Sequence, residues 1–317
     1  MDARQQGQRY PSDLTDAEWQ TIQGFLPPEV GGGRHRDTDM RAVVNGILYL
    51  LRSGCSWRML PKDFPPYTTV FEYYCQWRQD GTVLRIHDAL RCQVRLQAGR
   101  DPQPSAAVLD SQSVKTTEVG GGARGYDAGK KIKGRKRHLL VDTLGLVLLT
   151  VVHGANVQDR DGARLVLEKA KGCFPRLQKI WADGGYAGQL IGWVQAMCGW
   201  VLEIIKRSDV AKGFVLLPRR WVVERTFGWL GRHRRLSKDY QQFPARAFPV
   251  DRSLILACPF VKSSGKILRW LPHLSIQAKG LADHEAIRQE GRQAALRQEG
   301  TQVSLRRCPL HIAPRRF

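Results

Sequence analysis

Three acidic residues occupy positions from which they could share one cation. Asp110 follows the apolar run 106–109, and Asp183 closes the predicted strand 177–182, so each of these strands ends in a carboxylate. Ligands of α/β sheets bind beyond the carboxyl ends of strands. On neighbouring parallel strands these acids would lie side by side, which is costly unless a cation neutralises them. Glu224, in a basic helical segment, would be the third ligand.

Oxygen ligands of this kind suit Mg²⁺ or Mn²⁺. Two such ions about 3.5–4 Å apart can activate an attacking oxygen and stabilise a leaving one in phosphoryl transfer. Each acid also has a plain structural explanation. Asp110 could end a strand, Asp183 could form a turn with the two glycines after it, and Glu224 could pair with Arg220. The alternative is that all three acids belong to one metal site for phosphodiester chemistry.

The segment 219–235 is predicted to be a basic helix built around Glu224. Arg220 precedes Glu224 by one turn on the same face, and Gly228 and Gly231 follow it by one and two turns without a side chain. A ligand could therefore approach Glu224 closely. A solvated basic helix with a single ion pair is the other interpretation of these residues.

The composition indicates a folded protein that binds a polyanion. The chain has 317 residues, a 42% hydrophobic content and a formal net charge of +21. This length accommodates two domains, and this charge excess attracts nucleic acid. No run approaches the roughly 20 apolar residues that span a bilayer, and the first residues lack the apolar core of a signal peptide. We expect a cytoplasmic, nucleoid-associated protein with no membrane partner.

The seven cysteines include no C-x-x-C pair, which argues against a structural zinc site and against a disulfide framework. A basic run over residues 130–138 lies just ahead of a predicted hairpin. This run is either a solvated loop or a phosphate contact beside the acids. On the second interpretation, the predicted DNA-binding residues are Lys130, Lys131, Lys133, Arg135, Lys136, Arg137, Arg220 and Arg232.

The first part of the chain is predicted to be helical. Thr15 and Glu18 form a capping-box pattern, apolar residues recur at helical spacing over 40–51 until Gly54, and a third helix is expected to begin near Thr69. A fourth helix is expected over 83–96. These helices predict a DNA-binding module over residues 10–98, plausible as a helix-turn-helix variant, without indicating which helix would enter a groove.

After a polar linker at 100–104, the pattern changes to strands. A strand ends at Asp110, a hairpin joins runs 139–141 and 146–152, and helices and strands then alternate up to the helix that carries Glu224. An antiparallel hairpin followed by parallel crossovers predicts an α/β sheet flanked by helices. It is also the order of a ribonuclease H-like fold, predicted here for residues 105–243.

The α/β region contains five ordered motifs: 108–115 (VLDSQSVK), 125–131 (GYDAGKK), 157–163 (VQDRDGA), 182–188 (ADGGYAG) and 221–227 (WVVERTF). These motifs resemble those of DDE transposases of bacterial insertion sequences, specifically family five, which is related to family four. Residues 14–19 (LTDAEW) and 54–61 (GCSWRMLP) resemble the N-terminal domain of the same family.

The resemblance implies a ribonuclease H-like core in which Asp110, Asp183 and Glu224 bind Mg²⁺ or Mn²⁺. It implies cleavage at the ends of the element, attack of the freed 3′ hydroxyl on target DNA, and an oligomer assembled on terminal inverted repeats. Arg220 matches the family's arginine four residues before the glutamate. The family's tyrosine falls at Leu217 and its later basic residue falls at Gly231, beside Arg232, so these accessory roles are in doubt.

The basic tail over 244–317 departs from the family, which closes with an apolar helix. One hypothesis is that a frameshift replaced that helix. Two alternatives to an active transposase remain open at this point: a remnant that binds DNA without cutting it, and a host nuclease of the same fold that cuts without terminal repeats.

Overall fold

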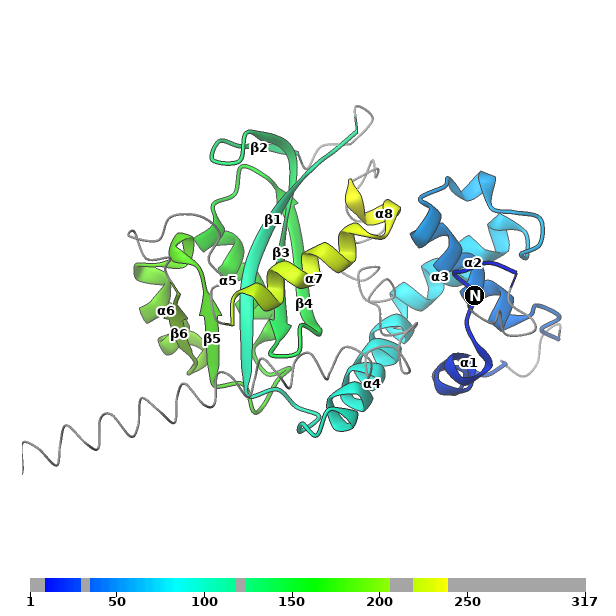
Figure 1. Cartoon of the computed structure of the whole chain (residues 1–317), viewed down its shortest axis with the longest axis horizontal. Helices are drawn as coiled ribbons and strands as arrows, with labels where there is room; N and C mark the ends of the chain where they lie inside the picture. The colour runs from blue at the N-terminus through cyan, green and yellow to red at the C-terminus, as the bar shows by residue number, and fades with distance from the viewer. Residues whose placement is uncertain (1–8, 30–34, 118–123, 206–218, 239–317) are drawn as a thin grey trace, which may run out of the picture. The chain divides into compact units, whose positions relative to one another are not determined.

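A computed structural model of the protein describes residues 9–29, 35–117, 124–205 and 219–238 (Figure 1). The predicted features at Leu217 and in the tail over 244–317 lie outside these residues.

Helices form the first part of the described chain, as predicted. Thr15 caps the first of them, because its hydroxyl accepts from the Glu18 N–H at 3.2 Å and the Glu18 carboxylate accepts from the Thr15 N–H at 2.7 Å. The third helix begins at Tyr67, close to the predicted start near Thr69. Its N-cap residue is Pro66, which makes no side-chain cap because its ring carries no hydrogen-bond acceptor. The elements are α1 (Asp16–Gln23), α2 (Met40–Ser53), the 3₁₀ helix η1 (Trp57–Met59), α3 (Tyr67–Gln79) and α4 (Thr82–Gln97).

A mixed sheet follows, and the predicted hairpin is its antiparallel part. Within the described residues the sheet order is β2-β3-β1-β5-β6. The short β2 pairs with the start of β3, and β4 pairs with the rest of β3. Neighbours are antiparallel among β1, β3 and β4, and parallel among β1, β5 and β6. This is the arrangement of a ribonuclease H-like core. The strands are β1 (Ala106–Lys115), β2 (Gly125–Asp127), β3 (Ile132–Asp142), β4 (Val147–Gly154), β5 (Lys179–Ala182) and β6 (Val201–Ile204).

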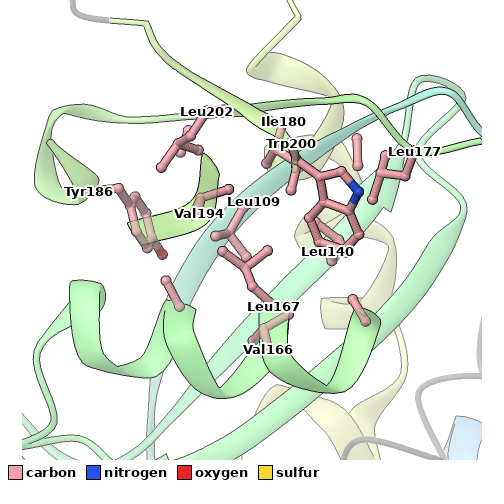
Figure 2. Packing of buried hydrophobic residues seen from close by; sticks show 14 of the residues in the cluster. Leu109, Leu140, Val166, Leu167, Leu177, Ile180, Tyr186, Val194, Trp200 and Leu202 are labelled. Carbon is pink, nitrogen blue, oxygen red and sulfur yellow. The ribbon is translucent and has the colours of Figure 1, made fainter. Parts of the chain in front are cut away.

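Helices cover both faces of the sheet. On one face, α5 (Asp159–Ala170) and α6 (Gln189–Cys198) bury a cluster in which Leu109 and Leu140 of the sheet lie close to Val166 and Leu167 of α5 (Figure 2). On the other face, α7 (Trp221–Gly231) crosses β1 and β3 (Figure 1). The aspartate of β1 and the glutamate of α7 are thereby brought to one side of the sheet.

The prediction of one continuous helix over 219–235 was wrong. The helix α7 ends at Gly231, His233 has an extended backbone, and the short α8 (Arg234–Ser237) follows. Gly228 and Gly231 weaken the last turn of α7, because glycine loses more backbone freedom in a helix than other residues.

A buried histidine, His138, and a partly buried one, His153, lie between the sheet and α5. The rings of His138 and His153 are 4.9 Å apart between centroids, and the Tyr186 hydroxyl lies 3.3 Å from His138 Nδ1. Gly162 of α5 faces both rings so closely that a Cβ there would collide with both Nε2 atoms. The helix can approach the histidines only because residue 162 has no side chain.

Replacing Gly162 by alanine should therefore lower the free energy of unfolding. We expect the loss to be about 1–3 kcal/mol larger than that caused by a control glycine-to-alanine change. The matched change is Gly192→Ala in α6, where a Cβ would meet no atom within 4 Å and only the helix propensity improves. Urea denaturation of both variants measures the difference. Equal stabilities would show that the histidine rings move aside at no cost.

The same histidine should make stability depend on pH. Burial lowers the pKa of His138 to about 3, with the neighbouring His153 as a second cause. Because an unfolded histidine has a pKa of about 6.5, the unfolded chain takes up this proton first as pH falls. This contribution to stability is complete above pH 6.5 and is lost progressively as pH falls from 6.5 toward 3.

Between pH 6.5 and 4, the unfolding free energy of the wild type should fall more steeply than that of His138→Gln. Urea denaturation at several pH values measures both slopes. Comparison with the variant is needed because burial raises the pKa of Asp110 to about 6, which changes stability in the opposite direction in both proteins. Identical slopes would contradict the prediction.

Candidate active site

Asp110 and Asp183 occupy equivalent positions on two neighbouring parallel strands. The last paired residues of β1 and β5 are Val108 and Trp181, and each aspartate lies two residues further along. The prediction that a strand ends at Asp110 was wrong, because β1 continues to Lys115 by pairing with β3, where Asp110 lies opposite Leu139. The two aspartates therefore lie just after the point where the pairing of β1 with β5 ends.

Each aspartate is held by a nearby backbone N–H. Asp110 accepts a hydrogen bond from the Ser111 N–H at 2.7 Å. Asp183 accepts from the Gly185 N–H at 2.8 Å and so caps the 3₁₀ helix η2 (Gly184–Tyr186), which is the turn that its two glycines predicted. These bonds orient both carboxylates without neutralising them.

Burial is the main reason that Asp110 is electrostatically unusual. It raises the pKa of this carboxyl to about 6; the Ser111 N–H lowers the pKa, the charge of Asp183 raises it further, and Arg220 and Lys130 lower it. A partly buried carboxyl beside a second acid favours the neutral form, and a nearby cation favours the ionised form. Further positive charge close to Asp110 would therefore stabilise its ionised form.

Arg220 joins the acid of α7 to the acid beyond β5. Its guanidinium Nη2 lies 3.5 Å from Glu224 Oε1 and 3.8 Å from Asp183 Oδ2. The Arg220 side chain is 17% exposed, whereas that of Glu224 is 51% exposed. The predicted one-turn pairing of Arg220 and Glu224 is thus present, and the same arginine extends to Asp183.

Asp110 and Asp183 are thus close enough to influence each other, while Glu224 is linked to Asp183 through Arg220. In the part of the chain that the structure describes, no three histidine, cysteine or acidic side chains lie close enough to one another to hold an ion. The donor chemistry of the three acids nevertheless fits a hard divalent cation, because all of their donor atoms are carboxylate oxygens. Glu224 is exposed on a helix, so its side chain has room to change rotamer.

The predicted basic run separates into exposed and buried cations. Lys130, Lys131 and Lys133 are exposed, and Lys130 Nζ donates to the Ser111 carbonyl at 3.1 Å, one residue from Asp110. Arg232 is also exposed, at the end of α7. These side chains are accessible to a polyanion, and Lys130 lies next to the segment that carries Asp110.

The other cations of the run are buried in β3, so the alternative of a solvated loop does not hold for them. Arg135, Lys136 and Arg137 are all at most 5% exposed. Lys136 Nζ lies 2.9 Å from Asp159 Oδ1, and Arg137 donates to the Leu236 carbonyl of α8 at 2.6 Å. Because helices cover both faces of the sheet, these side chains neutralise or bond internal groups and do not reach a phosphate in this structure.

Sequence reasoning missed the polar cluster that supports β1 beyond Asp110. The Ser111 hydroxyl donates to Asp159 at 2.8 Å, and the Ser113 hydroxyl donates to Asp127 at 2.5 Å. Lys136 lies between the two acids, 3.5 Å from Asp127 Oδ2. Serines alternating with other residues in a strand otherwise rich in apolar residues were the signal that could have revealed it.

Comparison with known proteins identifies two family regions. Residues 101–248 match the family described as "Transposase DDE domain", and residues 14–87 match "Putative transposase of IS4/5 family". Among the helices that the structure describes, each is too short or too polar to cross a membrane.

Two bacterial relatives are similar to part of the chain. An uncharacterized 16.2 kDa protein of the insertion element IS402 from Burkholderia cepacia is 30% identical over 114 residues, which are 34% of this chain and 76% of the relative. The uncharacterized protein y4sN of Sinorhizobium fredii is 28% identical over 117 residues, which are 37% of this chain and 87% of the relative. Together with the sheet order and the paired strand positions of the acids, these similarities show that the chain belongs to the DDE transposases of the IS4/5 insertion-element family.

Proposed function

We propose that this protein cleaves DNA at the ends of its own insertion element and joins the freed ends to target DNA. The observation that carries this proposal is the placement of Asp110 and Asp183 at equivalent positions of β1 and β5, with Arg220 linking Asp183 to Glu224, in a chain of this family.

The same three acids are the proposed ligands of Mg²⁺ or Mn²⁺. Their oxygens suit such ions, and the raised pKa of Asp110 supports a cation at this position, because a nearby positive charge would stabilise the ionised carboxylate. When bound, the metal would supply an activated water and stabilise the leaving oxygen of a phosphodiester. Asp110 and Asp183 are held by backbone N–H groups and so present oriented oxygens. Arg220 can neutralise charge that they leave uncompensated.

Five cations are the proposed contacts to DNA phosphates: the exposed Lys130, Lys131, Lys133 and Arg232, and the partly buried Arg220. Of these, Arg220 is the most buried and lies nearest the acids. We propose that residues 10–98 recognise the terminal repeats, that residues 105–243 perform the chemistry, and that several copies assemble on DNA. The two matched family regions support this division.

Cleavage of a defined duplex tests the proposal. The purified full chain, with Mg²⁺, should nick a labelled duplex that carries the inverted repeats found beside the gene. A duplex of the same composition with scrambled ends should stay intact. Equal cutting of both duplexes would indicate a general nuclease. Salt-dependent binding without any cutting would indicate an inactive remnant, and either result would overturn the proposed function.

The phosphate contacts make a separate prediction about salt. Replacing Lys131 and Lys133 together by glutamine should weaken DNA binding and reduce the slope of log affinity against log salt concentration by about two, since each lost phosphate contact lowers it by about one. Lys169→Gln on α5, also exposed, is the control and should leave the slope unchanged. Fluorescence anisotropy across a salt series measures this. An unchanged slope in the double variant would place the DNA elsewhere.

A further inference from the structure

The turn between β3 and β4 is held tightly from within. We refer to residues 142–146 as the β3–β4 turn. Asp142 is fully buried, and one carboxylate oxygen accepts from the Leu144 N–H at 2.9 Å and the Leu146 N–H at 2.8 Å. The other oxygen accepts from Arg95 of α4. The conformation of this turn is therefore determined by a single carboxylate with three donors.

The helix that carries Glu224 is bonded to the outer side of this turn. Arg225 Nη2 donates to the Leu144 carbonyl at 2.7 Å, and the Thr226 hydroxyl lies 2.9 Å from the Gly145 carbonyl oxygen. Gly145 has a φ of +82°, and a Cβ there would lie 2.9 Å from the Thr226 hydroxyl. A glycine in the left-handed conformation thus permits α7 to approach the turn this closely.

Arg225 is also fixed along its own helix. Its guanidinium lies 4.6 Å from the ring centroid of Trp221 and 4.4 Å from that of Trp229, one turn before and one turn after it. Such cation–π contacts favour a single direction for the side chain. Burial lowers the pKa of Arg225 to about 10, which still leaves it charged at neutral pH.

The Thr226 hydroxyl also lies 3.0 Å from the Val222 carbonyl oxygen of its own helix, so it is shared between α7 and the turn. Together with the bond of Arg225, this contact determines the rotation of α7, and with it the direction of Glu224. Successive residues of an α-helix point about 100° apart, so a helix that directs residues 225 and 226 at the turn directs Glu224 in one set direction. The turn begins at Asp142, three residues after Leu139, which pairs with Asp110. The short segment 139–142 of β3 therefore connects the residue paired with Asp110 to the turn that holds the helix of Glu224.

We infer that the β3–β4 turn positions Glu224 relative to Asp110, and that Thr226 and Arg225 are positioning residues for the site. This inference rests on the proposed function for its catalytic consequence. Neither residue touches the reacting atoms. Their contribution is to hold α7 in one rotation about its axis. This restricts the directions in which Glu224 can point.

Thr226 allows a clean test, because valine has nearly the same shape without the hydroxyl and serine keeps the hydroxyl. In the full-length protein, Thr226→Val should lower kcat for terminal-repeat cleavage by about 10- to 100-fold, since small misplacements of a catalytic group cost this much. KM and the affinity for DNA should not change. Thr226→Ser should retain most of the wild-type kcat. All measurements are made at a temperature where circular dichroism shows each variant to be folded.

Two further measurements separate this inference from the proposed function. Titration with Mn²⁺, followed by water proton relaxation, should show weaker binding in both Thr226→Val and Glu224→Gln. Amide hydrogen exchange should be faster in α7 of Thr226→Val and unchanged in α5. Wild-type kcat together with wild-type Mn²⁺ affinity in folded Thr226→Val would overturn the inference, as would equal defects in the serine and valine variants. If the wild type neither cleaves DNA nor binds Mn²⁺, the proposed function fails, and unchanged exchange in α7 then overturns the inference independently.

Discussion

Replacing Asp183 by asparagine should lower the rate of metal-dependent cleavage of the terminal repeats by on the order of 10³-fold or more. DNA binding should persist. Asparagine keeps the size of the side chain and can still accept from the Gly185 N–H, but it carries no charge. The proposed site would lose one of the two negative charges that follow the paired part of β1 and β5. Single-turnover cleavage measures the loss, and a gel-shift titration measures binding.

The control for this change is Asp161→Asn, the same substitution at an exposed acid in the first turn of α5. It should retain the wild-type rate. Cleavage at the wild-type rate by Asp183→Asn would remove Asp183 from the proposed ligand set. Loss of DNA binding together with cleavage would indicate that the substitution had disturbed the fold, and urea denaturation distinguishes that result.

Replacing Asp142 by asparagine should give the largest loss of stability, about 3–5 kcal/mol, which is the cost of leaving a buried charge without its partner. The oxygen of the introduced amide could still accept from the turn N–H groups, but the Arg95 guanidinium would keep its charge with no carboxylate beside it. Arg95 is only 4% exposed, so water cannot replace the lost partner. Urea denaturation at neutral pH measures the change.

Asp161→Asn serves again as the exposed control and should alter stability by less than about 0.5 kcal/mol. Adding Arg95→Met to Asp142→Asn should recover part of the loss, because the uncompensated charge is then gone. A loss below about 1 kcal/mol in Asp142→Asn, or no recovery in the double variant, would mean that the pair is not the main support of the β3–β4 turn. Such a result would also weaken the positioning role inferred for Thr226.

The capping pattern at Thr15 and the apolar runs of the hairpin were predictable because both depend on neighbours in the sequence. Helix starts that depend on a proline, as at Pro66, were placed less well. The break between α7 and α8 was missed because helical spacing continues through Gly231, although the helix does not.

The candidate site was predictable only in part. The order of elements and the resemblance pointed to Asp110, Asp183 and Glu224, and the structure places the two aspartates at equivalent strand positions. The extension of Arg220 from Glu224 to Asp183 could not be predicted, because it depends on how α7 crosses the sheet. The roles of the three acids as metal ligands stay a proposal.

By itself, the sequence determined the residue types, their order, and the local signals that make a helical segment, a hairpin and alternating strands and helices. Only the tertiary structure decided which cations reach solvent: Lys133 does, whereas Arg135 and Arg137 lie inside the covered sheet. It also decided that Asp142, a residue of a hairpin turn, would bind Arg95 and support the helix that carries Glu224. The physical reason is that burial and pairing depend on contacts between segments far apart in the chain, which local patterns do not encode.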